Sequence, residues 1–322
     1  MYQVTKGQWN GQATYILHSD QLEVTLLPGL GNNVIRIWDK VLNRDVLRKP
    51  EESDFDFYMQ KPYHFGIPLL IPPGRIRRGK FEYAGVQYQF DQNTANNNHI
   101  HGLHRTQSWK VTDLQEQDDY CSITTTFYTK DDPNWVRQYP TPLKLEMVLE
   151  LRGAELKQTL HTQNLGEQAA PFGFGVHTWF MIDGEPDKWT VQVPVDAIYE
   201  LDDELITTGE VVGLEPFEGL PNGMNLKGTN FDTVFRVTKG QPVEARLTRE
   251  DGLKLIYSAN QPYFKHWVLY TKGKADQFVC LEPYTWLTDA PNSKFGSDVT
   301  GLIDIQPQEQ VELVIHLNIE HP

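Results

Sequence analysis

The stretch that decides the fold is LKLEMVLELR, residues 143–152, in which apolar and charged residues alternate almost without a break. Leucine or methionine stands at every odd position, and only Val148 interrupts the charged residues at the even positions. Successive side chains of a β-strand point to opposite sides, so a period of two places all the odd positions on one face. This stretch therefore predicts a strand with one buried face.

The same period recurs near the end of the chain, where valine, leucine or isoleucine occupies every second position from 311 to 319. Shorter strand-like runs occur in WTVQVPVDAIYEL (189–201) and GLKLIYS (252–258), and the connections carry Gly, Pro, Asn and Asp, as turns favour. Few windows show apolar residues at helical spacing without an intervening Pro or Gly. The sequence predicts an all-β protein, and one large antiparallel β-sandwich is the simplest architecture.

Length and composition predict how this sandwich is organised. The 322 residues are 39% hydrophobic, with 24 Gly and 20 Pro, so the chain can bury a sizeable core and needs many turns. It contains no low-complexity segment, no fixed-period repeat and no long Pro-, Gly- or Ser-rich linker. We therefore expect residues 1–322 to form a single domain, a size that β-sandwiches reach.

Charge and cysteine content narrow the classes of partner. Acidic residues outnumber basic ones by 43 to 29, and a net charge of −14 repels a nucleic-acid backbone. The sequence has no signal-like start and no apolar run of the length that a membrane helix requires, so we expect a cytoplasmic protein with no membrane partner. The spacing of the only cysteines, Cys121 and Cys280, predicts two buried thiols rather than a disulfide framework or a thiolate zinc site.

The segment NNNHIHGLHR, residues 96–105, is the first candidate for chemistry. If it is extended, His99 and His101 share a face, as in some metal sites, although Arg105 would add an unfavourable positive charge. The alternative is a polar loop whose Asn and His side chains satisfy backbone groups.

Two further candidates lie far along the chain. His177 follows a Gly-rich aromatic stretch in PFGFGVHTWF (171–180), where a single histidine is more often a hydrogen-bonded core residue than a catalyst. Glu282 lies on an otherwise apolar strand, on the same face as Cys280, and a buried carboxylate needs partners or a function. A sheet can bring His101, His177 and Glu282 to one concave face, where a histidine and a glutamate form an acid/base pair.

Five motifs, in order over about residues 65–292, resemble those of the aldose 1-epimerase family, also known as galactose mutarotases. They are PPGRIRRGKFEYAGVQY (72–88), HIHGLHR (99–105), PFGFGVHTWF (171–180), KGTNFDTVF (227–235) and CLEPYTWLTDAPN (280–292). The resemblance implies the family's supersandwich fold and a sugar as substrate. It places Arg75 and Asp232 at substrate-binding positions, His101 and His177 at the active-site histidines, and Glu282 at the catalytic base.

The resemblance also implies the activity, which is interconversion of the α and β anomers of a hexose by acid/base ring opening and closure. That reaction requires no cofactor and no metal. Four aromatic residues near the proposed site in sequence are candidates for stacking on the sugar's apolar face, with packing in the β core as the alternative for each: Phe174, Trp179, Tyr284 and Trp286. Of these, Trp179 is predicted to bind the substrate.

Two alternatives remain open from the residues alone. His104-Arg105 is similar to the hexose-6-phosphate epimerase branch, in which one of Arg36, Arg77, Arg78 and Arg105 would meet the phosphate. The other alternative is a non-catalytic sugar-binding sandwich, which would not need an acid/base pair. His99 is expected to have a supporting or structural role.

Overall fold

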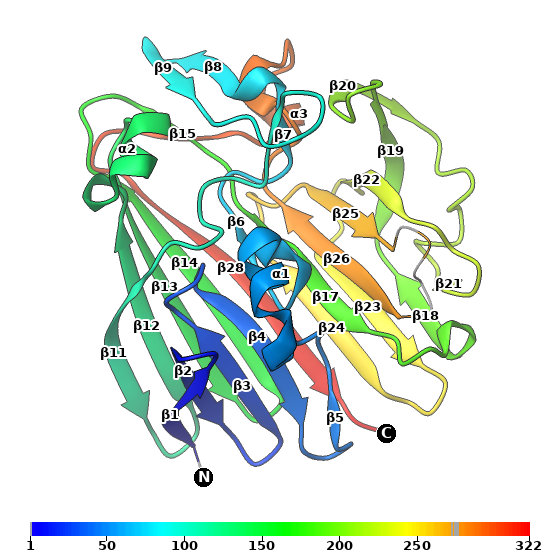
Figure 1. Cartoon of the computed structure of the whole chain (residues 1–322). Helices are drawn as coiled ribbons and strands as arrows, with labels where there is room; N and C mark the ends of the chain where they lie inside the picture. Colours follow the sequence, from blue (N-terminus) through cyan, green and yellow to red (C-terminus); the bar gives the residue numbers. More distant parts are fainter. Residues whose placement is uncertain (1, 272, 274–276) are drawn as a thin grey trace.

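The computed structural model describes residues 2–271, 273 and 277–322, and within them antiparallel β-sheets dominate (Figure 1). The nine-stranded sheet consists, in spatial order, of β11 (Lys110–Glu116), β12 (Cys121–Tyr128), β13 (Leu143–Arg152), β14 (Glu155–Asn164), β28 (Gln310–Glu320), β24 (Lys254–Ala259), β23 (Val243–Arg249), β18 (Trp189–Gln192) and β21 (Met224–Asn225). The eight-stranded sheet consists of β20 (Thr207–Val212), β19 (Val195–Leu201), β22 (Asp232–Val237), β25 (His266–Tyr270), β26 (Phe278–Tyr284), β16 (Gly175–Val176) and β6 (Leu69–Leu70), with β17 (Thr178–Met181) also paired to β26.

Smaller elements surround these two sheets. A five-stranded sheet is built from β1 (Gln3–Trp9), β2 (Gln12–His18), β3 (Leu22–Leu27), β4 (Asn33–Asp39) and β5 (Arg44–Asp45). Three two-stranded ribbons pair β7 (Arg75–Ile76) with β10 (His99–Ile100), β8 (Lys80–Tyr83) with β9 (Val86–Gln89), and β15 (Ala170–Phe172) with β27 (Ile303–Ile305). The α-helices of the described residues are short: α1 (Phe55–Gln60), α2 (Pro133–Gln138) and α3 (Ser297–Thr300). The prediction of an all-β sandwich is therefore confirmed.

The two strands with the clearest sequence period form as predicted. Strand β13 has the bounds of the quoted stretch, and its odd positions are buried while its even positions are not. In β28 the five apolar residues at odd positions from 311 to 319 are all buried. The run WTVQVPVDAIYEL, in contrast, divides between two sheets, because β18 ends before Pro194 and β19 begins after it. Proline has no N–H for a sheet ladder, which suits the point where the chain crosses from one sheet to the other.

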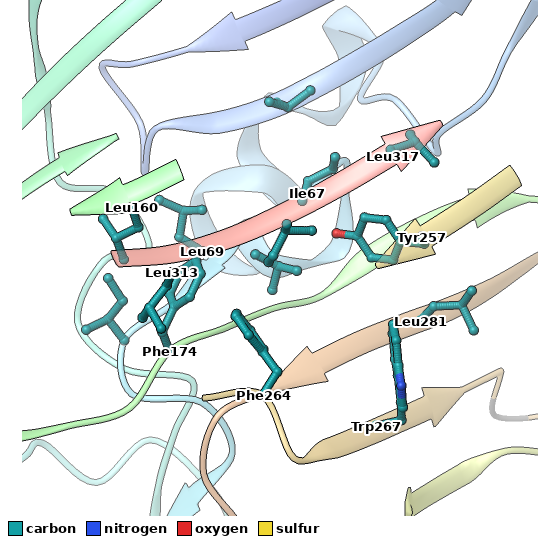
Figure 2. Close-up of a cluster of buried hydrophobic side chains, with 14 of the residues drawn as sticks. Ile67, Leu69, Leu160, Phe174, Tyr257, Phe264, Trp267, Leu281, Leu313 and Leu317 are labelled. Carbon is teal, nitrogen blue, oxygen red and sulfur yellow. The ribbon is translucent and has the colours of Figure 1, made fainter. Parts of the chain in front are cut away.

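The core lies between the two large sheets. Figure 2 shows Leu313 and Leu317 of β28 facing Trp267 and Leu281 of the eight-stranded sheet. Each fully buried side chain of this size contributes about 1.5–3 kcal/mol. This core includes residues from Leu17 to Ile319, so it ties distant parts of the chain together and gives the site a rigid base.

Two further observations bear on the sequence predictions. Cys121 and Cys280 are both buried free thiols, as expected. Within the described ranges, no helix has the length and apolarity needed to cross a bilayer.

Candidate active site

Strand β26 places a carboxylate in an apolar setting, because all seven of its residues are buried. Glu282 is 1% exposed, and its Oε2 accepts a hydrogen bond from the Tyr284 hydroxyl at 2.6 Å. Burial raises the pKa of Glu282 well above its usual range, the Tyr284 hydrogen bond lowers it, and the negative charge of Asp232 raises it. Glu282 is thus a buried carboxyl group with a raised affinity for a proton, which suits it to proton transfer.

His177 lies between β16 and β17, opposite this carboxylate. Its backbone N–H donates to the Pro68 carbonyl, and its Nε2 lies 3.3 Å from Glu282 Oε1. Burial lowers the pKa of His177 to about 3, and the electrostatic interaction with the His64 imidazole acts in the same direction. Both groups are shielded from water, so the charged form of each is stabilised only by the other group or by a bound ligand. A proton can therefore pass from one group to the other through a bound molecule.

The glycines before His177 make this geometry possible. A Cβ on Gly175 would lie 2.4 Å from Cδ1 of Tyr284, so only a glycine lets the Tyr284 ring pack against this strand. In the same way, a Cβ on Gly173 would meet the Trp286 ring at 2.3 Å. The Gly-rich aromatic stretch is therefore needed for the packing that holds Tyr284 beside Glu282.

His101 reaches the same place from a left-handed turn. Strand β10 ends at Ile100, and His101 has φ +64° with its N–H donating to the Gly74 carbonyl at 2.9 Å. The next residue, Gly102, has φ +68°, and a Cβ there would lie 2.0 Å from the Ile71 carbonyl oxygen. The ring of His101 lies 5.7 Å from that of His177, centroid to centroid. Burial, and after it the electrostatic interaction with His177, lowers the pKa of His101 well below its usual range.

The metal interpretation of NNNHIHGLHR is wrong in its premise, because the segment is not extended through His101. His99 instead donates from Nδ1 to the Asp91 carbonyl at 2.7 Å. His104 accepts a hydrogen bond from Trp109 Nε1 at 3.3 Å and packs among aromatic rings. His99 and His104 are therefore structural, in agreement with the polar-loop alternative.

A cavity of about 230 Å³ opens over the His177–Glu282 pair. It is lined by all six of the site residues predicted from the sequence: Arg75, His101, His177, Trp179, Asp232 and Glu282. Drug-sized ligands usually occupy about 300–1,000 Å³, so this cavity suits a smaller molecule.

Arg75 and Asp232 both line the cavity and come from different strands, β7 and the start of β22. Burial lowers the pKa of Arg75, and the negative charge of Asp232 opposes that effect. Together they provide hydrogen-bond donors and acceptors for hydroxyl groups.

The four aromatic candidates fall into two groups, those that line the cavity and those that pack in the core. Trp179 stacks on His177 with centroids 4.8 Å apart and an interplanar angle of 6°, and its Nε1 donates to the Tyr63 carbonyl. Tyr284 also lines the cavity, whereas Phe174 and Trp286 belong to the hydrophobic core. Trp179 therefore fixes the plane of the His177 ring as well as forming part of the wall.

Three of the lining residues that were not among the predictions carry aromatic rings: Tyr63, His64 and Tyr270. Tyr63 and His64 belong to a short 3₁₀ turn and show no spacing that points to a site. Tyr270 lies on β25, where its alternation signals only a strand. Their role follows from the sheet pairing and not from a local pattern.

The arginines nominated for a phosphate lie elsewhere: Arg36, Arg77, Arg78 and Arg105 do not line the cavity. Arg36 pairs with Asp45, and both Arg77 and Arg78 pair with Glu204. Arg105 donates to the Ile100 carbonyl and lies over the Tyr63 ring. Each of these guanidinium groups thus already has a partner.

Comparison with known proteins adds an independent observation. The sequence model for aldose 1-epimerase matches residues 14–318. This chain belongs to the aldose 1-epimerase family. The galactose mutarotase of Rattus norvegicus is 26% identical to it over 214 residues, which cover 62% of this chain and 57% of the relative. The uncharacterized protein YihR of Escherichia coli is 26% identical over 204 residues, which cover 62% of this chain and 61% of that protein.

Solved structures of similar proteins have the same fold. A galactose mutarotase-like protein from Clostridium acetobutylicum superposes with a TM-score of 0.92 at 24% identity, over 100% of this chain and 99% of the other. The galactose 1-epimerase of Lactobacillus acidophilus gives a TM-score of 0.78 at 17% identity, over 99% and 98% of the two chains. The sequence matches to the first relatives span about three fifths of those relatives' own length, so the family and the fold are established and the reaction is a separate question.

Proposed function

We propose that this protein is an aldose 1-epimerase, an isomerase that interconverts the α and β anomers of a free hexose. The observation that carries the proposal is the His177–Glu282 pair, buried at 3.3 Å in the wall of a cavity of monosaccharide scale. A non-catalytic sugar-binding sandwich has no use for such a pair, because burying both groups costs free energy that sugar binding alone does not recover.

The chemistry follows from the two groups. In the form of the pair in which the shared proton lies on His177, the Glu282 carboxylate accepts the proton of the C1 hydroxyl, the C1–O5 bond breaks as C1=O forms, and the His177 imidazolium gives its proton to O5. Rotation about C1–C2 presents the other face of the aldehyde. Ring closure with the two roles reversed delivers the second anomer and returns both protons.

The remaining predicted residues hold the sugar during these steps. His101 stands close enough to His177 to stabilise charge near the ring oxygen, and Arg75 and Asp232 bind hydroxyls. Trp179 keeps the His177 ring in one orientation and offers an apolar surface. Positioning of this kind accounts for a large share of the rate that an enclosed site can provide.

A free sugar is favoured over a sugar phosphate by the positions of the arginines. Arg75 is the only arginine among the described residues that line the cavity, and the nearby carboxylates of Asp232 and Glu282 repel an anion. A phosphate group needs a guanidinium or ammonium partner, and Arg77, Arg78 and Arg105 are engaged outside the cavity.

Polarimetry tests the proposal directly. Wild-type protein should accelerate the decay of optical rotation of freshly dissolved α-glucose or α-galactose, and Glu282→Gln should lower the rate by about 10²- to 10⁴-fold, the usual contribution of a general base. Faster turnover of hexose 6-phosphates than of free hexoses would favour the phosphosugar branch. Sugar binding by a wild-type protein that leaves every decay unchanged would establish the binding-module alternative.

A further inference from the structure

The face of β26 that carries Glu282 also carries a thiol that the proposed reaction does not use. Cys280 is two residues before Glu282, so both side chains point to the same side of the strand. Cys280 is fully buried, lies outside the lining of the cavity and packs with Trp179 and Phe278. One ligand atom from each of His177, Cys280 and Glu282 lies within 4.8 Å of the other two.

This grouping has the composition of a soft-metal site. Histidine nitrogen, cysteine sulfur and carboxylate oxygen are the three ligand types of Zn²⁺, and three protein ligands with one open position are typical of zinc sites that face a cavity. With metal–ligand bonds of about 2.0–2.3 Å, tetrahedral ligands stand about 3.3–3.7 Å apart. His177 Nε2 and Glu282 Oε1 are already at 3.3 Å, so only the Cys280 side chain would have to move closer.

Charge balance favours a divalent ion at this place. A thiolate and a carboxylate supply two negative charges and His177 binds as a neutral ligand, so a complex with Zn²⁺ is neutral overall. A neutral complex avoids the cost of burying a net charge. The Tyr284 hydroxyl already donates to Glu282 Oε2, which is the kind of outer hydrogen bond that orients a metal-binding carboxylate.

We propose that His177, Cys280 and Glu282 form a binding site for a soft divalent metal ion, represented by Zn²⁺ or Cd²⁺, and that the bound ion inhibits the enzyme reversibly. On binding, the Cys280 S–H and the proton held by the His177–Glu282 pair are both released to solvent, and the sulfur, the carboxylate and the neutral imidazole coordinate the metal with no change of oxidation state. The ion occupies the two groups that would exchange protons with the sugar, so metal and sugar exclude each other. Hard ions such as Mg²⁺ lack affinity for a thiolate and should not compete.

The spacing of the cysteines in the sequence predicted the absence of any thiolate zinc site, and the proposal departs from that prediction. His177 and Cys280 are 103 residues apart in the sequence, and the pairing of β17 with β26 brings them together.

Inhibition can be measured only if the proposed function holds, so the test also needs a readout that does not depend on activity.

The activity arm uses protein freed of metal with EDTA, which should itself leave turnover unchanged. Micromolar Zn²⁺ should then slow mutarotation, EDTA or excess sugar should restore it, and Mg²⁺ should have no effect. In Cys280→Ala the Zn²⁺ concentration for half-inhibition should rise by at least about 10- to 100-fold, the loss that removal of even an outer partner causes. Basal turnover of Cys280→Ala should be kept.

Cys121→Ala is the matched control, because Cys121 is the other buried thiol and lies on β12, in the other sheet. It should retain the inhibition of the wild type. If Cys280→Ala and Cys121→Ala respond to Zn²⁺ as the wild type does, Cys280 is no ligand and the proposal is overturned.

The second arm is spectroscopic. Co²⁺ added to wild type and to Cys121→Ala should produce a thiolate-to-cobalt charge-transfer band, which Zn²⁺ displaces and which Cys280→Ala lacks. Zn²⁺ should also raise the Tm of the wild type, because a ligand of the native state stabilises it. Absence of the band in folded wild type would refute the site, whereas a band without any mutarotase activity would refute only the proposed function.

Discussion

Tyr284→Phe is the sharpest test of how the site controls Glu282, the proposed base. The substitution removes one oxygen atom and with it the 2.6 Å hydrogen bond to Glu282 Oε2, while the phenyl ring can keep its place against Gly175. That hydrogen bond lowers the pKa of Glu282 against the opposing effect of burial. Without it, the carboxylate form is harder to maintain and the pKa of Glu282 rises further.

The size of the effect follows from the kind of bond that is lost. A hydrogen bond to a charged group contributes about 1.5–3 kcal/mol, and one to a neutral group about 0.5–1.5 kcal/mol. The carboxylate therefore loses about 1–1.5 kcal/mol relative to the carboxylic acid, which corresponds to about a tenfold change in their ratio. Because the base must be ionised, activity is lost as the pH falls. Tyr284→Phe should lose its activity at a higher pH than the wild type does.

The assay is the pH dependence of kcat/KM by polarimetry, corrected for spontaneous mutarotation and run with EDTA. Its acidic limb reports the ionisation of the free His177–Glu282 pair as a unit. Tyr270→Phe is the control, since Tyr270 lines the same cavity without a hydrogen bond to Glu282 among the described contacts. Coincident acidic limbs for wild type and Tyr284→Phe would refute the assignment of Tyr284 as the residue that tunes the base.

Two other substitutions test the segment around His101. Gly102→Ala places a Cβ 2.0 Å from the Ile71 carbonyl oxygen at φ +68°, so we expect the free energy of unfolding to fall by about 1–3 kcal/mol and turnover to fall with it. Denaturant titration and polarimetry measure the two effects, and unchanged stability would contradict the strained turn. His104→Ala removes the acceptor for Trp109 Nε1 and should cost about 1–3 kcal/mol of stability while the folded protein keeps its kcat/KM, and a specific loss of activity at full stability would place His104 in the site.

The fold, and the six predicted residues that line the cavity, follow largely from local sequence patterns. The alternation in LKLEMVLELR is reproduced residue by residue in β13, because a strand with one buried face leaves its period in the sequence. Glu282 stands out in the sequence for a similar reason, since a carboxylate is costly to bury and its neighbours on the strand are apolar residues that are buried. The order of the five motifs then links Glu282 with four residues that line the same cavity: Arg75, His101, His177 and Asp232.

What the tertiary structure alone decided is the set of relations between distant residues. No spacing in the chain predicts that Tyr284 donates to Glu282, that His99 bonds the Asp91 carbonyl instead of facing the cavity, or that Cys280 joins His177 and Glu282. These facts depend on strand register and on where β10 ends, and register is set by the packing of the whole sandwich. The sequence determined which residues have the chemistry for proton transfer, because residue type and period are local properties. Their contacts, and therefore their proton affinities, were decided only when the sheets packed and removed water from around them.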